Sequence, residues 1–242
     1  TPDDFGTRGE APTHPELLDY LADQFRKNGW SMKWLHRQIM LSRAYHQGAI
    51  ENEHSREVDP ENKLLWRMPR RRLDFESMRD SMLAASDELD ITMGGKPIDL
   101  NASPAIPRRS VYGFVNRDII ANLMSTFDSA NPNACTAQRP ETTVPQQALF
   151  ALNSDFIQDR AARLASITKQ LSSASDEDRI VAMVRRTLCR TPTESEVNQA
   201  KTFLSEAIPS ATATDGAAVD PERSWTLLAH ALMASNEFTF LD

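Results

Sequence analysis

Apolar residues recur at intervals of three and four along most of the chain, which is the spacing of one face of an α-helix. The clearest stretch runs from Phe75 through Met78 to Met82, with Arg79 on the opposite, polar side. Capping boxes at 13–16, 143–146 and 193–196 mark further helix starts. Together, the apolar spacing and the helix-start signals predict helices over residues 13–29, 31–45, 119–127, 143–157, 176–188, 193–204 and 220–232. We therefore expect a mainly α-helical, multi-helix protein.

Three segments depart from this spacing. Ser110–Val115 is rich in β-branched and aromatic residues and predicts one short strand or hairpin region. Residues 47–62 carry many acids and few apolar partners, which predicts an exposed loop. The segment 128–143 is rich in Asn, Pro and Thr, and loops of that length are uncommon in compact domains unless they are functional.

These patterns indicate two parts that pack as one unit. Residues 1–168 would form a larger helical part, with a strand-containing insertion and the long loop. Residues 169–242 would form a C-terminal three-helix bundle.

Composition narrows the class of protein. With 40% hydrophobic and 25% charged residues, the chain is that of a folded globular protein rather than a disordered one. The net charge of −7 repels polyanions, so nucleic-acid binding is not expected. Its longest strictly aliphatic stretch, Ile180–Val184, is far shorter than a membrane-spanning helix, so no transmembrane segment is expected. The chain opens on Thr-Pro-Asp-Asp, and we interpret it as a fragment of a longer polypeptide.

No catalytic or metal-binding motif is recognisable, so no catalytic residue is assigned. None of the five histidines lies four residues from another, and we expect neither a metal site nor a cofactor in this chain. Cys135 and Cys189 lack metal-site or redox spacing and could be free or paired. Neither a nucleophile elbow nor a phosphate-binding glycine loop occurs.

Two groups of residues are candidates for binding an anion or another ligand. Arg108 and Arg109 lie in a segment without acids, beside Tyr112, and guanidinium groups bind carboxylate, sulfate or phosphate. The second group lies in the long loop before a helix N-terminus: Cys135, Arg139, Glu141, Thr142, Thr143 and Gln146. A structural alternative stays open, in which Thr142 or Thr143 caps the helix, Glu141 pairs with Arg139 and Cys135 packs as a small apolar residue.

A further arginine cluster, 67–72, is better explained by structural ion pairs. Four arginines occur within six residues and are followed at once by acids. We expect pairs with Asp74, Glu76, Asp80 and Asp118.

Four separated strings, in order, resemble one family. They are TPDDFGTRGEAPTHPELLDYLA, RRSVYGFVNRD, RPETTVPQQALFALNSDF and LAHALMASNEFTFLD. They are similar to the C-terminal domain of unknown function of large planctomycete proteins that carry cytochrome c-like domains. One departure is Cys189 in LCRTPTESE, where that family commonly has Gly.

The resemblance implies an exported, extracytoplasmic or periplasmic protein whose upstream domains are its partners. It also implies haem in such an upstream domain, since this chain has no Cys-x-x-Cys-His motif. We therefore expect a structural or interaction module of a cell-envelope protein. The alternative is part of an enzyme that binds or degrades an anionic, sulfated polysaccharide.

Overall fold

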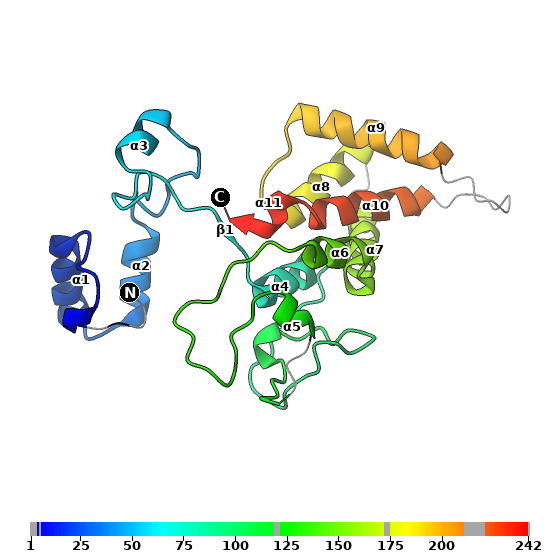
Figure 1. Ribbon diagram of the computed structural model, residues 1–242. Helices are drawn as coiled ribbons and strands as arrows, with labels where there is room; N and C mark the ends of the chain where they lie inside the picture. Colours follow the sequence, from blue (N-terminus) through cyan, green and yellow to red (C-terminus); the bar gives the residue numbers. More distant parts are fainter. Residues whose placement is uncertain (1–3, 5, 119–121, 172–174, 211–220, 242) are drawn as a thin grey trace. The chain divides into compact units, whose positions relative to one another are not determined.

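The computed structural model describes residues 4, 6–118, 122–171, 175–210 and 221–241. The protein is mainly α-helical, as the sequence predicts (Figure 1). It divides into two compact units, residues 1–71 and residues 72–241. Each unit is described by itself below.

The first unit holds three short α-helices and a 3-10 turn. They are η1 (Gly6–Arg8), α1 (Pro15–Lys27), α2 (Met32–Met40) and α3 (Glu53–Val58). Ser31 caps α2 by accepting a hydrogen bond from the backbone N–H of Trp34, and Gly29 adopts the left-handed conformation expected after α1. The described part of this unit contains no buried apolar residue.

Two local predictions for this unit are wrong. Residue His14, not Thr13, precedes α1, and the Thr13 hydroxyl contacts the His14 ring instead of the helix. Residues 47–62 are not loop throughout, because the Asn52 side chain accepts from Ser55 N–H and starts α3. None of the residues of α2 is buried, although α1 packs against it.

The second unit is built around a core of α-helices. Helix α7 (Asp155–Leu171) packs along α10 (Pro221–Met233). The expected C-terminal three-helix group is formed by α10 together with α8 (Asp176–Leu188) and α9 (Glu194–Ser210), which pack on one another. Helix α4 (Phe75–Ala85) contacts both α7 and α8. All of these helices lie in one compact unit, and the expected boundary between residues 1–168 and 169–242 stays a prediction.

Shorter elements complete the second unit. They are η2 (Ser110–Tyr112), α5 (Asn122–Thr126), α6 (Pro145–Asn153), α11 (Asn236–Thr239) and the paired strands β1 (Arg71–Arg72) and β2 (Phe240–Leu241). The expected helix 119–127 is α5 in its described part, and residues 119–121 lie outside the described residues. The expected helix 143–157 is two helices, because the extended backbone of Ser154 separates α6 from α7.

The strand predicted at Ser110–Val115 is wrong. Its first residues form η2, and only Gly113 makes an isolated bridge, to Ile98. The reason is that Asp80 accepts hydrogen bonds from both the N–H and the hydroxyl of Ser110, at 2.8 and 2.7 Å. A backbone donor that a side chain satisfies needs no neighbouring strand.

One residue predicted on the polar side of α4, Arg79, is instead buried, and this matters for the site. Asp74 caps the helix at Ser77 N–H, and Phe75, Met78 and Met82 are buried as expected. Arg79 is buried as well, with 2% of its surface exposed. Its guanidinium group finds acceptors beneath the helix that the sequence spacing does not indicate.

Candidate functional site

Arg108 has a structural role, because its side chain is hydrogen-bonded to the backbone of a nearby turn. Its guanidinium donates to the carbonyls of Thr92, Gly94 and Lys96, and its Cζ atom lies 4.3 Å from the centre of the Tyr112 ring. The Tyr112 hydroxyl accepts from Gly94 N–H at 2.9 Å. Arg108 and Tyr112 together therefore hold the turn at residues 92–96.

Arg109 is the more accessible arginine of this pair. Its side chain is 53% exposed, and its Nε lies 3.8 Å from a carboxylate oxygen of Asp80. An ion pair at that distance and exposure is weak, so Arg109 is available to an anion in solution.

The long loop is closed by a hydrogen-bonded clip between its two ends. The carboxylate of Asp128 accepts from the N–H and the hydroxyl of Thr142, at 2.9 and 2.7 Å. Arg72 pairs with Asp128 at 2.7 Å and also donates to the Thr142 carbonyl and to Gln147 Oε1. Gln147 in turn donates to the Thr126 carbonyl at 2.8 Å.

Electrostatics at this clip favour the ionised carboxylate. Burial opposes ionisation, but the hydrogen bonds from Thr142 and Arg72 outweigh it and hold the pKa of Asp128 below its usual value. Asp128 also adopts a left-handed backbone conformation, with φ of 58°. The clip therefore orders both ends of the loop at the N-terminal side of α6.

Arg139 anchors the middle of the loop to α4. Its two terminal nitrogens donate to the two carboxylate oxygens of Glu76, at 2.8 and 3.0 Å, and this raises the pKa of the arginine. The partner of Arg139 is thus Glu76, and not Glu141 as the structural alternative supposed.

The other loop candidates lie at the surface. Cys135 and Cys189 are both free and exposed, so they do not form a disulfide. Glu141 and Gln146 are exposed, and Thr143 lines a cavity of about 170 Å³ together with Arg72 and Gln147. Helix α6 starts after Val144 without a threonine side-chain cap, so neither Thr142 nor Thr143 caps it.

Helix α4 connects the two predicted groups. Glu76 holds Arg139, and Asp80, one turn later, holds Ser110 and faces Arg109. Arg139 and Arg109, candidate residues from two distant segments, thus contact neighbouring turns of α4.

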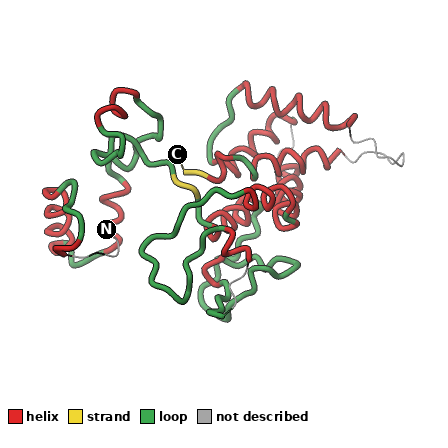
Figure 2. The backbone as a smooth tube through the Cα atoms, in the orientation of Figure 1, coloured by secondary structure: helices red, strands yellow, loops and turns green. Residues whose placement is uncertain are grey.

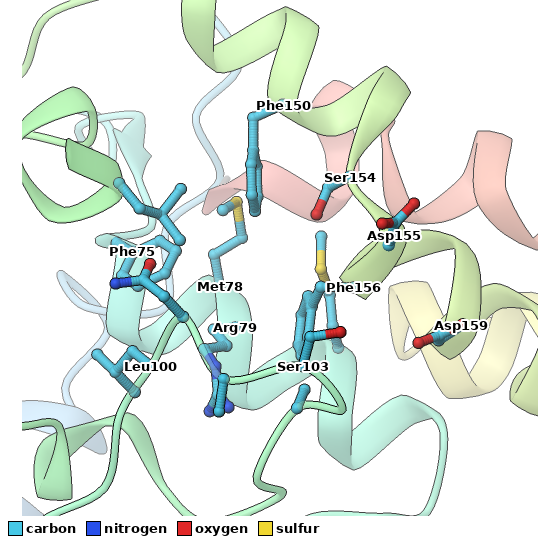
Figure 3. Close-up of a pocket in the computed structure, with 15 residues that line it drawn as sticks. Phe75, Met78, Arg79, Leu100, Ser103, Phe150, Ser154, Asp155, Phe156 and Asp159 are labelled. Atoms are coloured by element: carbon cyan, nitrogen blue, oxygen red, sulfur yellow. The ribbon is translucent and has the colours of Figure 1, made fainter. Parts of the chain in front are cut away.

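A cavity of about 240 Å³ lies between α4, α7 and residues 100–105 (Figure 3). Apolar side chains form most of its wall: Phe75, Met78, Met82, Leu100, Leu123, Phe150 and Phe156. Polar groups come from Arg79, Asn101, Ser103, Ser154, Asp155 and Asp159. Figure 3 shows Ser154, Asp155 and Asp159 together on one side of the cavity.

Arg79 forms part of the cavity wall with its hydrogen bonds directed into the protein. Its terminal nitrogens donate to the carbonyls of Ile106 and Arg108 and to the Ser110 hydroxyl, at 2.7, 3.0 and 3.2 Å. Burial lowers the pKa of Arg79, and the Asp80 carboxylate opposes that effect. Arg79 therefore holds residues 106–110, which directly follow the cavity-lining segment 100–105.

Sequence reasoning missed several of these residues. Arg72 was expected to pair with a nearby acid, but its partner is Asp128, more than fifty positions away. The glutamine in the clip is Gln147, whereas Gln146 was singled out. A Gln at the third position of a helix is a known capping signal, and counting from Val144 instead of Thr143 would have indicated Gln147.

No set of three His, Cys, Asp or Glu side chains gathers as a metal site anywhere in the described part of the chain. Within the same residues, no helix has the length and apolar character that crossing a membrane requires.

The fold and site thus define a mainly α-helical protein. Its second unit has a surface loop whose ends are joined by hydrogen bonds between Asp128 and Thr142, and a mostly apolar cavity. The chain belongs to the PSD1 family, described as a protein of unknown function (DUF1553), whose model matches residues 1–204. No curated protein and no solved structure matches the chain. The match includes the whole first unit and the second unit as far as α9.

Proposed function

We propose that this chain is a non-catalytic interaction module of a larger cell-envelope protein. Its partner in this proposal is another domain of the same polypeptide. The envelope location and the presence of upstream domains rest on the sequence resemblance, whereas the interaction role rests on the first unit's surface.

One observation carries the interaction role. In the described part of residues 1–71, no large apolar side chain is buried. Many are exposed to solvent, among them Trp30 at 67%, Leu41 at 68% and Ile50 at 88%. A folded unit that exposes many large apolar side chains and buries none offers surface for association.

The exposed apolar residues include the rims of a groove. Tyr20 and Leu17 of α1 face Ile39 of α2 and residues 65–69 across a cavity of about 410 Å³. Tyr20, Leu17 and Ile39 are each at least 40% exposed. An apolar ridge of a partner domain would remove these side chains from water and stabilise the complex.

The polar candidates support the same conclusion. Arg108 and Arg139, which a sulfated glycan would require, are already bonded to carbonyls or to Glu76. Arg109 alone of these three arginines is more than half exposed. The alternative of an anionic polysaccharide therefore stays a prediction that rests mainly on Arg109.

The test measures binding of the 242-residue chain to the separately purified remainder of the polypeptide. We expect the Tyr20→Ser, Ile39→Ser variant to bind at least about tenfold more weakly, because two apolar contacts are lost. The matched control is Leu227→Ser, which alters a 43% exposed leucine of α10 in the second unit and should leave affinity unchanged. Equal affinity of the double variant and the unchanged chain would refute the proposal.

A further inference from the structure

We propose that the cavity between α4, α7 and residues 100–105 binds a small carboxylate with an apolar body, and that Arg79 holds the carboxylate group. The cavity lies wholly in the second unit, so this inference does not depend on the interaction surface of the first unit.

The cavity has room for a small, largely apolar molecule. Its volume is about 240 Å³, and Phe75, Met78 and Met82 on its α4 side are all at least 94% buried. An apolar cavity of about 150 Å³ already accommodates benzene. The larger cavity of this protein therefore accommodates an apolar body of similar size together with a polar head.

Arg79 brings a buried cation with free hydrogen-bond donors to the cavity wall. The residue is 2% exposed, and a guanidinium group has five N–H donors. Three of them are used, because Nη1 donates to the Arg108 carbonyl and the Ser110 hydroxyl and Nη2 donates to the Ile106 carbonyl. The N–H of Nε and the second N–H of Nη2 have no acceptor among the described residues.

The two free donors of Arg79 suit a carboxylate. Nε and Nη2 form one edge of the planar guanidinium group, and the two oxygens of a carboxylate bind such an edge side by side. A buried donor without an acceptor destabilises a folded protein. Since Arg79 lines the cavity, a ligand there can supply the acceptors that the protein does not.

The charge of Arg79 is only partly balanced by the protein. The carboxylate of Asp80 lies 3.9 Å from Nη1 of Arg79, and it also lies 3.8 Å from Nε of Arg109. The other arginine beside Arg79, Arg160, pairs with its own acid, Glu88, at 2.7 Å. One carboxylate, that of Asp80, thus serves two guanidinium groups, and a ligand carboxylate would add the second negative charge.

Two acids on the other side of the cavity determine the orientation of the ligand. Figure 3 shows Asp155 and Asp159 across the cavity from Arg79 and Leu100. Both acids are exposed, so water and salt screen their charges, while still disfavouring an anion beside them. The ligand carboxylate should therefore lie at Arg79, with the apolar body against Met82 and its neighbours in the wall.

The test uses the full chain with 13C-labelled methionine methyl groups and 15N-labelled arginine. At neutral pH, hexanoate should shift the methyl signals of Met78 and Met82 and the Nε–H signal of Arg79. Its Kd should be at least about tenfold lower than that of hexanamide, which has the same chain without the charge. The net charge of −7 disfavours anions in general, so this preference would come from the site itself. The Nε–H signal of Arg179 should stay in place, because that atom is enclosed by the protein.

A variant of the cavity wall leaves Arg79 and its structural hydrogen bonds intact. Ala105→Leu enlarges a side chain that lines the cavity and should raise the Kd of hexanoate at least about tenfold. The control, Ala134→Leu, makes the same change at an exposed position of the long loop and should not alter the Kd. Equal affinity for hexanoate and hexanamide, tighter binding of n-hexylammonium, an unmoved Arg79 Nε–H signal or undiminished binding by Ala105→Leu would each overturn the proposal.

Discussion

Glu76 and Asp80 lie one turn apart on α4, and each binds a different distant segment. Glu76 accepts hydrogen bonds from both terminal nitrogens of Arg139, and Asp80 accepts hydrogen bonds from the N–H and the hydroxyl of Ser110. Because Phe75, Met78 and Met82 of the same helix are in the core, α4 fixes the long loop and the 98–113 segment relative to the core.

Replacing Glu76 with Gln should loosen the long loop with little effect on global stability. Arg139 is 39% exposed, and pairs of this kind contribute about 0.2 to 1 kcal/mol. We expect faster proteolytic cleavage within residues 129–141 and a nearly unchanged Tm. Arg139→Gln should behave in the same way, and an unaltered cleavage rate in both variants would contradict the anchoring role.

Replacing Gly113 with Ala should destabilise the second unit by about 1 to 3 kcal/mol, the cost of overpacking. A Cβ atom there would lie 2.5 Å from Leu100 Cδ1 and 3.0 Å from the Ser110 carbonyl oxygen. Urea unfolding measures the effect. Gly48→Ala is the control, because its Cβ would meet nothing within 4 Å. Adding Leu100→Ala to the Gly113→Ala variant should restore only the part of the lost unfolding free energy that the leucine contact causes, because the contact with the Ser110 carbonyl oxygen remains.

Replacing Arg79 should be far more damaging than replacing Arg109. Without Arg79, the carbonyls of Ile106 and Arg108 lose a buried donor, at a cost of about 3 kcal/mol or more. Lys would not restore the loss, since one ammonium group does not reproduce the planar fork of donors. Arg109→Gln, at a 53% exposed side chain, should change the free energy of unfolding by less than about 0.5 kcal/mol.

Stability should fall as the pH drops from about 4.5 to about 2, in part because of Glu196. Hydrogen bonds from Arg190, and then from Thr193 N–H, lower the pKa of Glu196 from 4.5 to about 2. A carboxyl group whose pKa is lower in the folded state stabilises the fold above its unfolded pKa and loses this effect on protonation. The Glu196→Gln variant should therefore show a flatter stability profile in that window, measured by urea unfolding at several pH values.

Residues 72–242 should unfold cooperatively when produced alone, because the second unit contains all of the buried apolar residues of the described chain. Residues 1–71 alone should show a broad transition or none, since the described part of that unit has no buried apolar residue. Calorimetry of the two pieces tests both expectations. A sharp transition in residues 1–71 would show that the exposed apolar groove is not a consequence of a missing partner.

The sequence predicted features that depend on neighbouring residues. Ser31 and the Thr193–Glu196 capping box start their helices as expected, because each cap is completed within one turn. The helical spacing of Phe75, Met78 and Met82 also placed them correctly in the core. The mainly helical fold follows from such local signals, summed over the chain.

Features that depend on distant partners could not be predicted in this way. Arg79 can be buried because the carbonyls of residues 106 and 108 accept hydrogen bonds from its guanidinium group. Ser110 leaves the expected strand because the Asp80 carboxylate accepts a hydrogen bond from its N–H. The Arg72–Asp128 pair closes a contact between segments whose proximity no local pattern indicates. The nine candidate site residues stay predictions, and the sequence did not indicate the partners that the structure gives to Arg108, Arg139 and Thr142.

The clip between Asp128 and Thr142 has a consequence for how this protein can change. Figure 2 shows the intervening segment as a wide loop outside the helices. Because its two ends are joined to each other, at 2.9 Å from Thr142 N–H to Asp128, the helices on either side do not depend on the path between them. New residues could be inserted into this segment, or its sequence exchanged, while α5 and α6 keep their places. A foreign peptide could thus be grafted into this loop at little cost to the folding of the scaffold, provided that Arg139 and its contact with Glu76 are kept.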